Sequence, residues 1–319
     1  MNIELWIMNG TKGYQPSVLG GITWETSRQG EPGILKFTCI QDDVLDITEG
    51  NPVKMLVDGV NVFFGFIFDK QRDKKKQWQI TAYDQLRYFK NKDSYIYVNK
   101  RADQVISMIA KDFLLNVGEL ADTGYVIASK VEDNKTLFDI VQNALDDTLR
   151  STTRLYVLYD DFGKITLKDS ENMLLNLLID EETGENFTYK SSINDNTYNQ
   201  IKIIYDNDKT GKREVYIAKD STNINNWGLL QYFESVDNPQ GASAKVDALL
   251  KLYNAKTRNL KITKAFGDVR VRAGSSVVVK LDLGDVKVQN FMLVENVKHT
   301  FNKDSYTMDL TLRGGEFVA

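Results

Sequence analysis

Residues 59–89, GVNVFFGFIFDKQRDKKKQWQITAYDQLRYF, decide the fold class of this chain. Their first part alternates with a period of two residues, which is the period of a β-strand. Four apolar side chains share one face of this predicted strand: Val62, Phe64, Phe66 and Phe68. Phe63 and Ile67 lie on the other face, so both faces of the strand are apolar and both need cover.

A second strand and a short helix follow. Residues 78–83 alternate cleanly, and the charged stretch 70–77 is typical of a solvated hairpin loop. The two arms therefore predict an antiparallel hairpin. The alternation stops at Asp84, whose short acceptor side chain suits the N-cap of a short helix through Leu86 and Phe89.

The chain before this hairpin has the same short, extended character. Turn sequences rich in Gly, Asn and Pro separate four segments of strand composition: residues 3–8, 21–26, 34–40 and 53–57. Together with the hairpin they make about six strands, enough for a small barrel or sandwich. We therefore predict an N-terminal β-barrel domain over residues 1–95.

Helical periodicity replaces alternation after Asn99. Apolar residues recur at helical spacing over residues 102–113 and 137–149, and Thr136 with Asp139 resembles a capping box. With a hairpin over 155–167, residues 96–169 are expected to form helices plus a hairpin. Residues 170–257 are expected to form a hairpin over 200–218 and then a helix over 246–253. Residues 173–179 fit either a helix turn or a strand.

The last part of the chain is β in character again. Predicted strands cover residues 260–264, 269–272, 277–281, 287–299 and 306–313, with a turn at Leu283-Gly284-Asp285. They predict a C-terminal β-barrel domain over residues 258–319. The predicted fold class is therefore α+β and mostly β, with two small tube-type β-barrels flanking an α+β middle region over residues 96–257.

The composition argues against several classes of protein. With 40 basic and 44 acidic side chains the formal net charge is −4, whereas nucleic-acid and anionic-membrane binders usually carry a basic surplus. No apolar run approaches the ~20 residues of a membrane span, and no secretory signal is visible at the first residues. The single cysteine, Cys39, excludes an intrachain disulfide, and cytoplasmic synthesis fits.

Residue types that carry catalysis are scarce. His299 is the only histidine, so a site with several histidines is impossible, and we expect this residue to lie in a strand at a barrel rim. Cys39 shares a predicted strand face with Leu35 and Phe37, as a small buried apolar residue does. Adjacent acidic residues occur at several places, but spacing in sequence does not identify a glycosidase pair.

A metal-binding motif is also incomplete. Asp206, Asp208 and Gly211 have the spacing of a calcium loop, but Ile217 stands at the position where such a loop needs a bidentate Glu. A hairpin turn explains these residues better. We therefore predict no catalytic, cofactor-binding or metal site, and no enzymatic activity.

Apolar side chains on predicted outer strand faces point to assembly instead. Five candidate interface residues have this placement: Phe63, Ile67, Val278, Met292 and Val294. Two alternatives remain open, cover by the chain's own helices and cover by identical or stacked partner subunits. The basic run over residues 70–76 is interrupted by acidic residues and is typical of a soluble hairpin tip.

Several stretches resemble the baseplate hub proteins of contractile phage tails, of the kind found in defective prophages of Gram-positive bacteria. The stretches are ITAYDQL (80–86), KNKDSY (90–95), the helix over 102–112, ADTGY (121–125), KTLFDI (135–140), VENVKHTF (294–301) and YTMDL (306–310). The resemblance covers most of the chain and is weakest over residues 170–240. Its motifs are specific for the family and carry no catalytic signature.

The resemblance implies a homotrimer in which each subunit contributes two similar β-barrels. Such a pseudo-sixfold ring adapts a sixfold tail tube to a threefold central spike. The implied partners are the central spike protein, the tail tube or tube-initiator protein, and tape-measure and baseplate proteins, with no sequence-specific nucleic acid and no membrane. Assembly is expected in the bacterial cytoplasm, within the baseplate of a released phage tail or tail-like bacteriocin.

The leading hypothesis for function is therefore a structural baseplate hub of a contractile injection system. The alternative is a cell-wall hydrolase or peptidoglycan-binding component of the same particle. Turnover of purified peptidoglycan, lost on changing one acidic residue, would favour the alternative.

Overall fold

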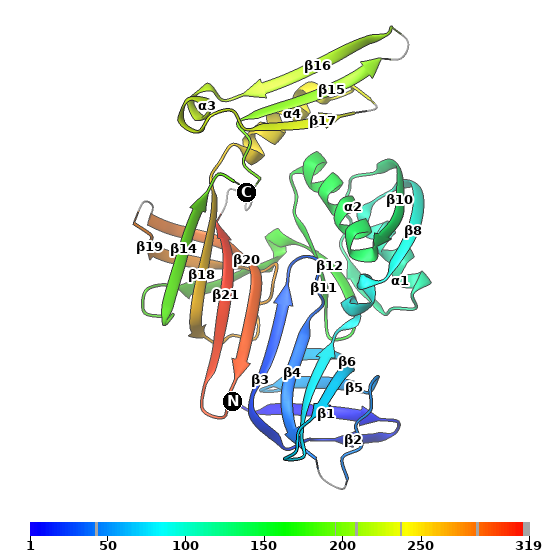
Figure 1. Cartoon of the computed structure of the whole chain (residues 1–319), viewed down its shortest axis with the longest axis vertical. Coiled ribbons are helices and arrows are strands. Elements are labelled where there is room, and N and C mark those ends of the chain that lie inside the picture. The colour runs from blue at the N-terminus through cyan, green and yellow to red at the C-terminus, as the bar shows by residue number, and fades with distance from the viewer. Residues whose placement is uncertain (42–43, 195, 208–209, 237, 285–286, 315–319) are drawn as a thin grey trace.

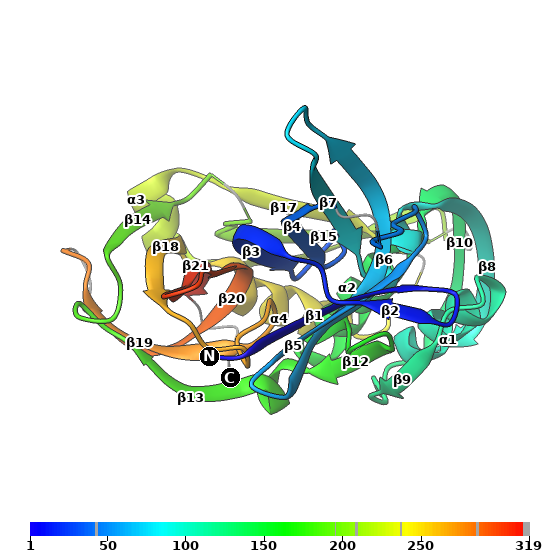
Figure 2. The same ribbon diagram turned by 90° about the horizontal axis from the view of Figure 1, so that it is seen from below.

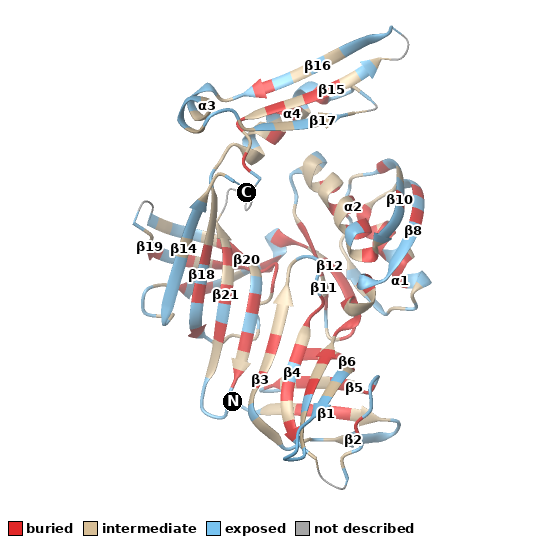
Figure 3. Ribbon diagram, viewed as in Figure 1, coloured by how far each residue is buried: buried red, intermediate tan, exposed pale blue. Residues whose placement is uncertain are grey.

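The computed structural model describes residues 1–41, 44–194, 196–207, 210–236, 238–284 and 287–314. The fold is α+β and mostly β, which confirms this part of the predicted fold class (Figure 1). Buried and exposed positions alternate along many of the strands, as expected for sheets with one face on a core (Figure 3).

The N-terminal β unit contains the strands β1 (Ile3–Asn9), β2 (Lys12–Tyr14), β3 (Val18–Ser27), β4 (Ile34–Ile40), β5 (Pro52–Val57), β6 (Val60–Arg72) and β7 (Gln77–Tyr83). Antiparallel pairing sets their spatial order as β3-β4-β7-β6-β5-β1-β2. Their inward side chains form one core, in which Ile7, Leu35 and Ile80 are at most 1% exposed. Cys39 lies in this core, as predicted.

The C-terminal β unit draws strands from two parts of the chain. They are β13 (Leu174–Ile179), β14 (Asn186–Ser192), β18 (Thr257–Phe266), β19 (Ser276–Asp282), β20 (Lys287–Phe301) and β21 (Tyr306–Gly314). The order is β14-β18-β21-β20, with β19 on β20 and β13 parallel to β19. Residues 173–179 are thus mostly strand, after a short 3₁₀ helix η2 (Ser170–Met173).

The two β units form one sheet. Antiparallel pairing of β3 with β20 joins them, with Ile22 opposite Phe301 and Trp24 opposite His299. In the described residues this sheet has 13 strands and runs from β14 at one end to β2 at the other. We call the β3–β20 pairing the seam.

The middle of the chain packs helices between small sheets. Its elements are η1 (Gln85–Lys90), β8 (Lys92–Lys100), α1 (Ala102–Asp112), β9 (Val117–Leu120), β10 (Ile127–Thr136), α2 (Leu137–Thr152), β11 (Tyr156–Asp160) and β12 (Ile165–Asp169). Both predicted helices are confirmed, and the Thr136 side chain accepts a hydrogen bond from the Asp139 amide at the start of α2. Side chains of α1 and α2 share a core with β11 and β12.

An outer unit lies at the far end of the molecule from β1 and β2 (Figure 1). It consists of β15 (Gln200–Asn207), β16 (Lys212–Lys219), α3 (Ser221–Trp227), β17 (Gln231–Ser235) and α4 (Ala242–Tyr253). The helix α4 covers one face of the β16-β15-β17 sheet, where Ile201, Val246 and Leu249 are buried. The predicted hairpin over 200–218 and the helix over 246–253 are both confirmed.

The hairpin of β6 and β7 differs from its prediction in two ways. Pairing continues to Arg72 opposite Trp78, so the loop shortens to residues 73–76 and the strands project from the body (Figure 2). The assignment of the two faces is also reversed, because Phe63 and Ile67 face the core while Phe64 and the next two phenylalanines of that face are half-buried. With both faces apolar, only the direction in which the sheet curls decides which one is inside.

Other local predictions have mixed outcomes. The Asp84 side chain accepts the Leu86 amide, as an N-cap does, and the helix that follows is 3₁₀. The prediction of a strand over residues 269–272 is wrong. The Asp268 carboxylate accepts hydrogen bonds from the Arg270 amide and guanidinium, and the chain turns there. Asp208 of the calcium-like spacing and Asp285 of the predicted turn lie outside the described residues.

Candidate assembly surfaces

His299 lies inside the seam rather than at a barrel rim. It is 0% exposed, and its ring stacks on that of Trp24 with centroids 4.7 Å apart. Nε2 donates to the carbonyl of Val271 at 2.9 Å, since a carbonyl only accepts, and Nδ1 accepts from the Tyr306 hydroxyl at 2.9 Å. Burial lowers the pKa of His299 to about 4, so the ring is neutral near pH 7.

The other face of the seam is closed by ionic and polar pairs. Glu295 accepts from Arg28 at 2.8 Å and lies 3.7 Å from Arg313. Lys298 and Glu25, opposite each other in the register, are 3.5 Å apart. The seam therefore has an aromatic inner face and a charged outer face, and both partners of each contact come from one chain.

The two β units repeat one topology. In the N-terminal unit, adjacent strands run β3-β4-β7-β6-β5, and in the C-terminal unit they run β14-β18-β21-β20-β19. All four pairings in each series are antiparallel, and the corresponding strands occur in the same order along the chain. The long strands β6 and β20 occupy the same place in the two series, and each pairs with two neighbours there. Each also carries a register shift, at residues 67–69 in β6 and at residues 294–296 in β20.

The register extends the repeat to single residues. Across the N-terminal unit Trp24 faces Leu35, which faces Ala82; across the C-terminal unit Tyr189 faces Leu260, which faces Leu312. Aligned in this way, residues 22–27, ITWETS, stand beside residues 187–192, FTYKSS. Residues 35–37, LKF, stand beside residues 260–262, LKI. The correspondence is found only once the pairing is known, because insertions separate the matching strands.

A buried polar cluster fixes the middle region against the β units. Asp84, 6% exposed, accepts the Gly33 amide at 2.8 Å and so ties η1 to the start of β4. Gln85 donates to Asp160 at 3.3 Å and to the carbonyl of Gly163, in the turn between β11 and β12. These contacts hold η1 between β4 and the β11–β12 turn.

Arg272 completes this cluster from the loop between β18 and β19. Its guanidinium donates to the Asp160 carbonyl at 2.7 Å and lies 3.9 Å from the centre of the Tyr159 ring. Burial, and then the charge of Asp160, raise the pKa of Asp84 well above its ordinary value, and burial raises the pKa of Asp160. Both carboxyl groups are buried, and the cluster joins η1, the β11–β12 turn and the loop between β18 and β19.

Four of the five predicted interface residues are covered by the chain itself. Phe63 and Ile67 lie in the N-terminal core and are 3% and 1% exposed, and Met292 and Val294 lie in the C-terminal core at 2% and 0%. Their apolar character is therefore explained without a partner. Val278 differs, because it is half-buried on the opposite face of β19.

Apolar side chains do reach the surface, on the face of β19 that carries Val278 and on two faces that sequence alternation did not single out. Val278 faces Leu178 and Phe291 in the register of β13, β19 and β20, and Leu178 is 44% exposed. On the β8–β10 ribbon the exposed apolar residues are Ile96, Val98 and Val131, and on the outer unit they are Val215, Ile217 and Phe233. Each set shares one sheet face by the two-residue repeat.

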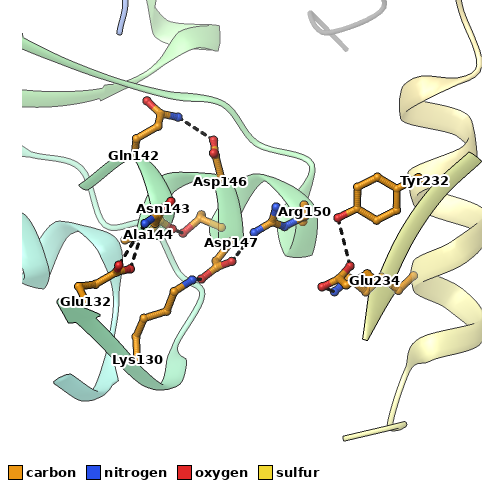
Figure 4. A network of polar contacts seen from close by, with 12 residues as sticks. Lys130, Glu132, Gln142, Asn143, Ala144, Asp146, Asp147, Arg150, Tyr232 and Glu234 are labelled. Atoms are coloured by element: carbon orange, nitrogen blue, oxygen red, sulfur yellow. Dashed lines mark hydrogen bonds and ion pairs between the residues drawn. The ribbon is translucent and has the colours of Figure 1, made fainter. Parts of the chain in front are cut away.

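Arg150 lies between α2 and the outer unit (Figure 4). It pairs with Asp147, which also pairs with Lys130 of β10, and it points toward Tyr232 and Glu234 of β17. Burial would lower the pKa of Arg150, but Asp147 and the groups on β17 outweigh it and raise that pKa. A charged helix end thus faces the outer unit.

No group of three or more metal-ligating side chains is found among the residues that the structure describes. The described helices include none long and apolar enough to cross a membrane.

Comparison with known proteins identifies the family. Residues 22–313 match the family described as YQBQ-like. The chain is 31% identical over 324 residues to the phage-like element PBSX protein XkdQ of Bacillus subtilis (strain 168), covering 97% of this chain and 96% of that protein.

Solved structures share the fold at low sequence identity. The 43 kDa tail protein of prophage MuSo2 from Shewanella oneidensis has a TM-score of 0.69 at 14% identity, covering 97% of this chain and 98% of its own. A tail protein from Neisseria meningitidis MC58 has a TM-score of 0.71 at 10% identity, covering 99% and 98%. The chain therefore belongs to the YQBQ-like family, which agrees with its resemblance to proteins of defective prophages, and it shares the fold of these solved tail proteins.

Proposed function

We propose that this protein is the structural hub of a phage-tail-type baseplate and works as a homotrimeric ring. One observation carries the proposal: each chain holds two β units of the same topology, placed side by side in one sheet. Three such chains supply six equivalent units. In a ring built from them, the repeated β units follow sixfold symmetry. All elements outside the repeat occur once per chain and follow threefold symmetry.

In this proposal each β unit closes as a tube-type barrel. The N-terminal unit corresponds to the predicted domain 1–95. The C-terminal unit consists of residues 258–319 together with β13 and β14 from the middle region, and the rest of 96–257 lies outside the ring. Three features lie outside the repeat, occur once in each chain and so suit threefold contacts: the ribbon of β8 and β10, the outer unit, and the helices α1 and α2.

The threefold side would hold the central spike and the sixfold side would receive the tail tube or its initiator. Tape-measure and other baseplate proteins are the further partners of this arrangement. The role is architectural rather than catalytic, which agrees with the enclosed positions of His299, Asp84 and Asp160. Assembly in the bacterial cytoplasm precedes release of the particle, either a phage tail or a tail-like bacteriocin.

The test is the native mass of the purified chain. Light scattering across a range of protein concentrations is expected to give three times the chain mass of 36.4 kDa, and electron micrographs should show rings with six similar lobes around the channel. A chain that stays monomeric at every concentration, or forms only dimers, would contradict the ring.

A further inference from the structure

The repeat leaves two strand edges without the neighbour that their counterparts have. Beyond its register shift, β20 lies between β21 and β3. The corresponding end of β6, residues 68–72, has β7 on one side only among the described residues, since β5 pairs with residues 60–66. Likewise β3 lies between β4 and β20, whereas its counterpart β14 pairs with β18 alone in the part of the chain that the structure describes.

We propose that residues 68–72 of β6 in one copy pair antiparallel with β14 of the next copy, repeating the seam between chains. The inference rests on the proposed ring and names the strands that close it. Each copy offers one edge of each kind, so the contact is head to tail. Contacts of this kind generate a ring when the rotation closes.

The repeat also fixes the register of this contact. Ile80 and Leu310 are equivalent, and they face Lys70 and Val297, so Lys70 corresponds to Val297. Counting along the strands then makes Arg72 the counterpart of His299. Because His299 faces Trp24, and Tyr189 is the counterpart of Trp24, Arg72 should face Tyr189 of the neighbouring copy.

The chemistry of the facing residues is compatible at this register. A guanidinium over the Tyr189 ring replaces the stacking of His299 on Trp24. Asp69 would face Ser192, where the seam has the hydrogen bond between Asn296 and Ser27. Gln71 would face Lys190, which puts no like charges opposite each other.

Both edges are accessible in the single chain. The β6–β7 hairpin projects from the body (Figure 2), and β14 is the last strand at one end of the sheet (Figure 1). Five of the seven β14 residues are exposed, among them Phe187 at 38%. A straight unpaired strand edge is a template for another strand.

The loop before β5 packs against the core side of residues 68–72 and leaves their backbone edge open. The equivalent loop of the C-terminal unit does the same at the seam. Lys70 Nζ donates to the carbonyl of Ile47 at 2.7 Å, and Ile47 belongs to the N-terminal core. In the C-terminal unit the equivalent loop presents the carbonyl of Val271 to His299 from the core side, and β20 still pairs with β3.

Disulfide trapping tests the register directly. Gln71 and Lys190 are exposed and, in the proposed pairing, directly opposite, with Cβ atoms about 4.5–5.5 Å apart, close enough to bridge with small adjustment. The variant Gln71→Cys/Lys190→Cys, oxidised at the concentration where the chain is oligomeric, should run as covalent trimers on a non-reducing gel. The native Cys39 is buried and shared by all variants.

The matched control moves one cysteine by one residue. In Gln71→Cys/Ser191→Cys the second thiol points to the opposite sheet face, so trapping should fall at least tenfold. Equal trapping in both variants, or none in a protein that light scattering shows to be trimeric, would overturn the proposed strand pairing while leaving the ring intact. A chain that is monomeric throughout would instead remove the ring and this inference together.

Discussion

The two β units share a strand order but differ in what joins and surrounds their strands. Between β3 and β4 the chain has only the short link 28–33, whereas between β14 and β18 it carries residues 193–256 with the whole outer unit. The first strand also differs, since β1 is antiparallel to β5 and β13 is parallel to β19. The five-strand order shared by the two β units therefore tolerates a large insertion at the connection between its first two strands.

The seam and the proposed contact between chains also differ in the polarity of their facing residues. The seam is aromatic inside, with His299 and Trp24 both buried. At the matching positions the open edges carry Arg72, which is exposed, and Tyr189, which is half-buried. An edge that exists in water before assembly needs polar residues to avoid wrong pairing, whereas strands of one chain are never separated after folding.

The largest expected effect breaks the seam. Trp24→Ala removes a buried ring that stacks on His299, and it should lower the free energy of unfolding by about 3–5 kcal/mol. Tyr189→Ala, at the equivalent place in the C-terminal unit, should cost clearly less because that residue is half-buried. Thermal and urea unfolding of both variants measure this, and equal losses would contradict the distinction between a closed and an open edge.

The next effect is a dependence of seam stability on pH. The folded pKa of His299, about 4, lies below its unfolded value of about 6.5, so its contribution is complete above that value and is lost as the pH falls toward 4. The full loss is on the order of 3 kcal/mol. Asp84 and Asp160, whose pKa values are raised, act with the opposite sign and favour the folded state as the pH falls.

The variant His299→Phe separates these contributions. It keeps an aromatic ring beside Trp24 but cannot be protonated, so its unfolding temperature should fall less than that of the original chain between pH 7 and pH 4.5. The variant loses two hydrogen bonds and should be less stable at pH 7. Parallel pH curves for the two proteins would show that His299 does not titrate in this range.

A smaller effect is expected at the open edge. Arg72→Glu places a carboxylate where the proposed contact needs a cation over the Tyr189 ring, so trimer dissociation should increase roughly tenfold, about 1.4 kcal/mol, while the monomer stays folded. Lys75→Glu makes the same change of charge at the hairpin tip and is the matched control. Sedimentation of both variants at several concentrations is the measurement, and equal weakening would indicate a general charge effect.

The smallest effect concerns the hairpin tip itself. Lys74, Lys75 and Lys76 are exposed, and no ion pair to them is found within the described residues. Replacing all three with Gln should change stability by less than about 0.5 kcal/mol and leave the native mass unchanged. If this variant dissociates, the ring is held by the charge of the tip rather than by strand pairing.

Sequence alone determined the parts of this protein whose order is local. Strand β4 was predicted at its observed bounds, and α1 and α2 appeared at the predicted places, because periodicity and a capping Thr136 act within one or two turns. The inner faces of two strands could not be recognised from the sequence, for a common reason. In β6 both faces are apolar, and in β8 the buried Tyr95 and Tyr97 alternate with the exposed Ile96 and Val98, so polarity does not mark the inner face.

Tertiary structure decided the rest, because it depends on pairing between distant segments. Nothing near His299 in sequence shows that Trp24 will stack on it from 275 residues away, or that the carbonyl of Val271 will accept a hydrogen bond from its ring. The match of residues 22–27 with 187–192 becomes visible only when strand order aligns the two β units. A β-strand records its own alternation, whereas its neighbours and its inner face are set by the whole sheet, since each edge hydrogen-bonds to whichever strand the fold brings beside it.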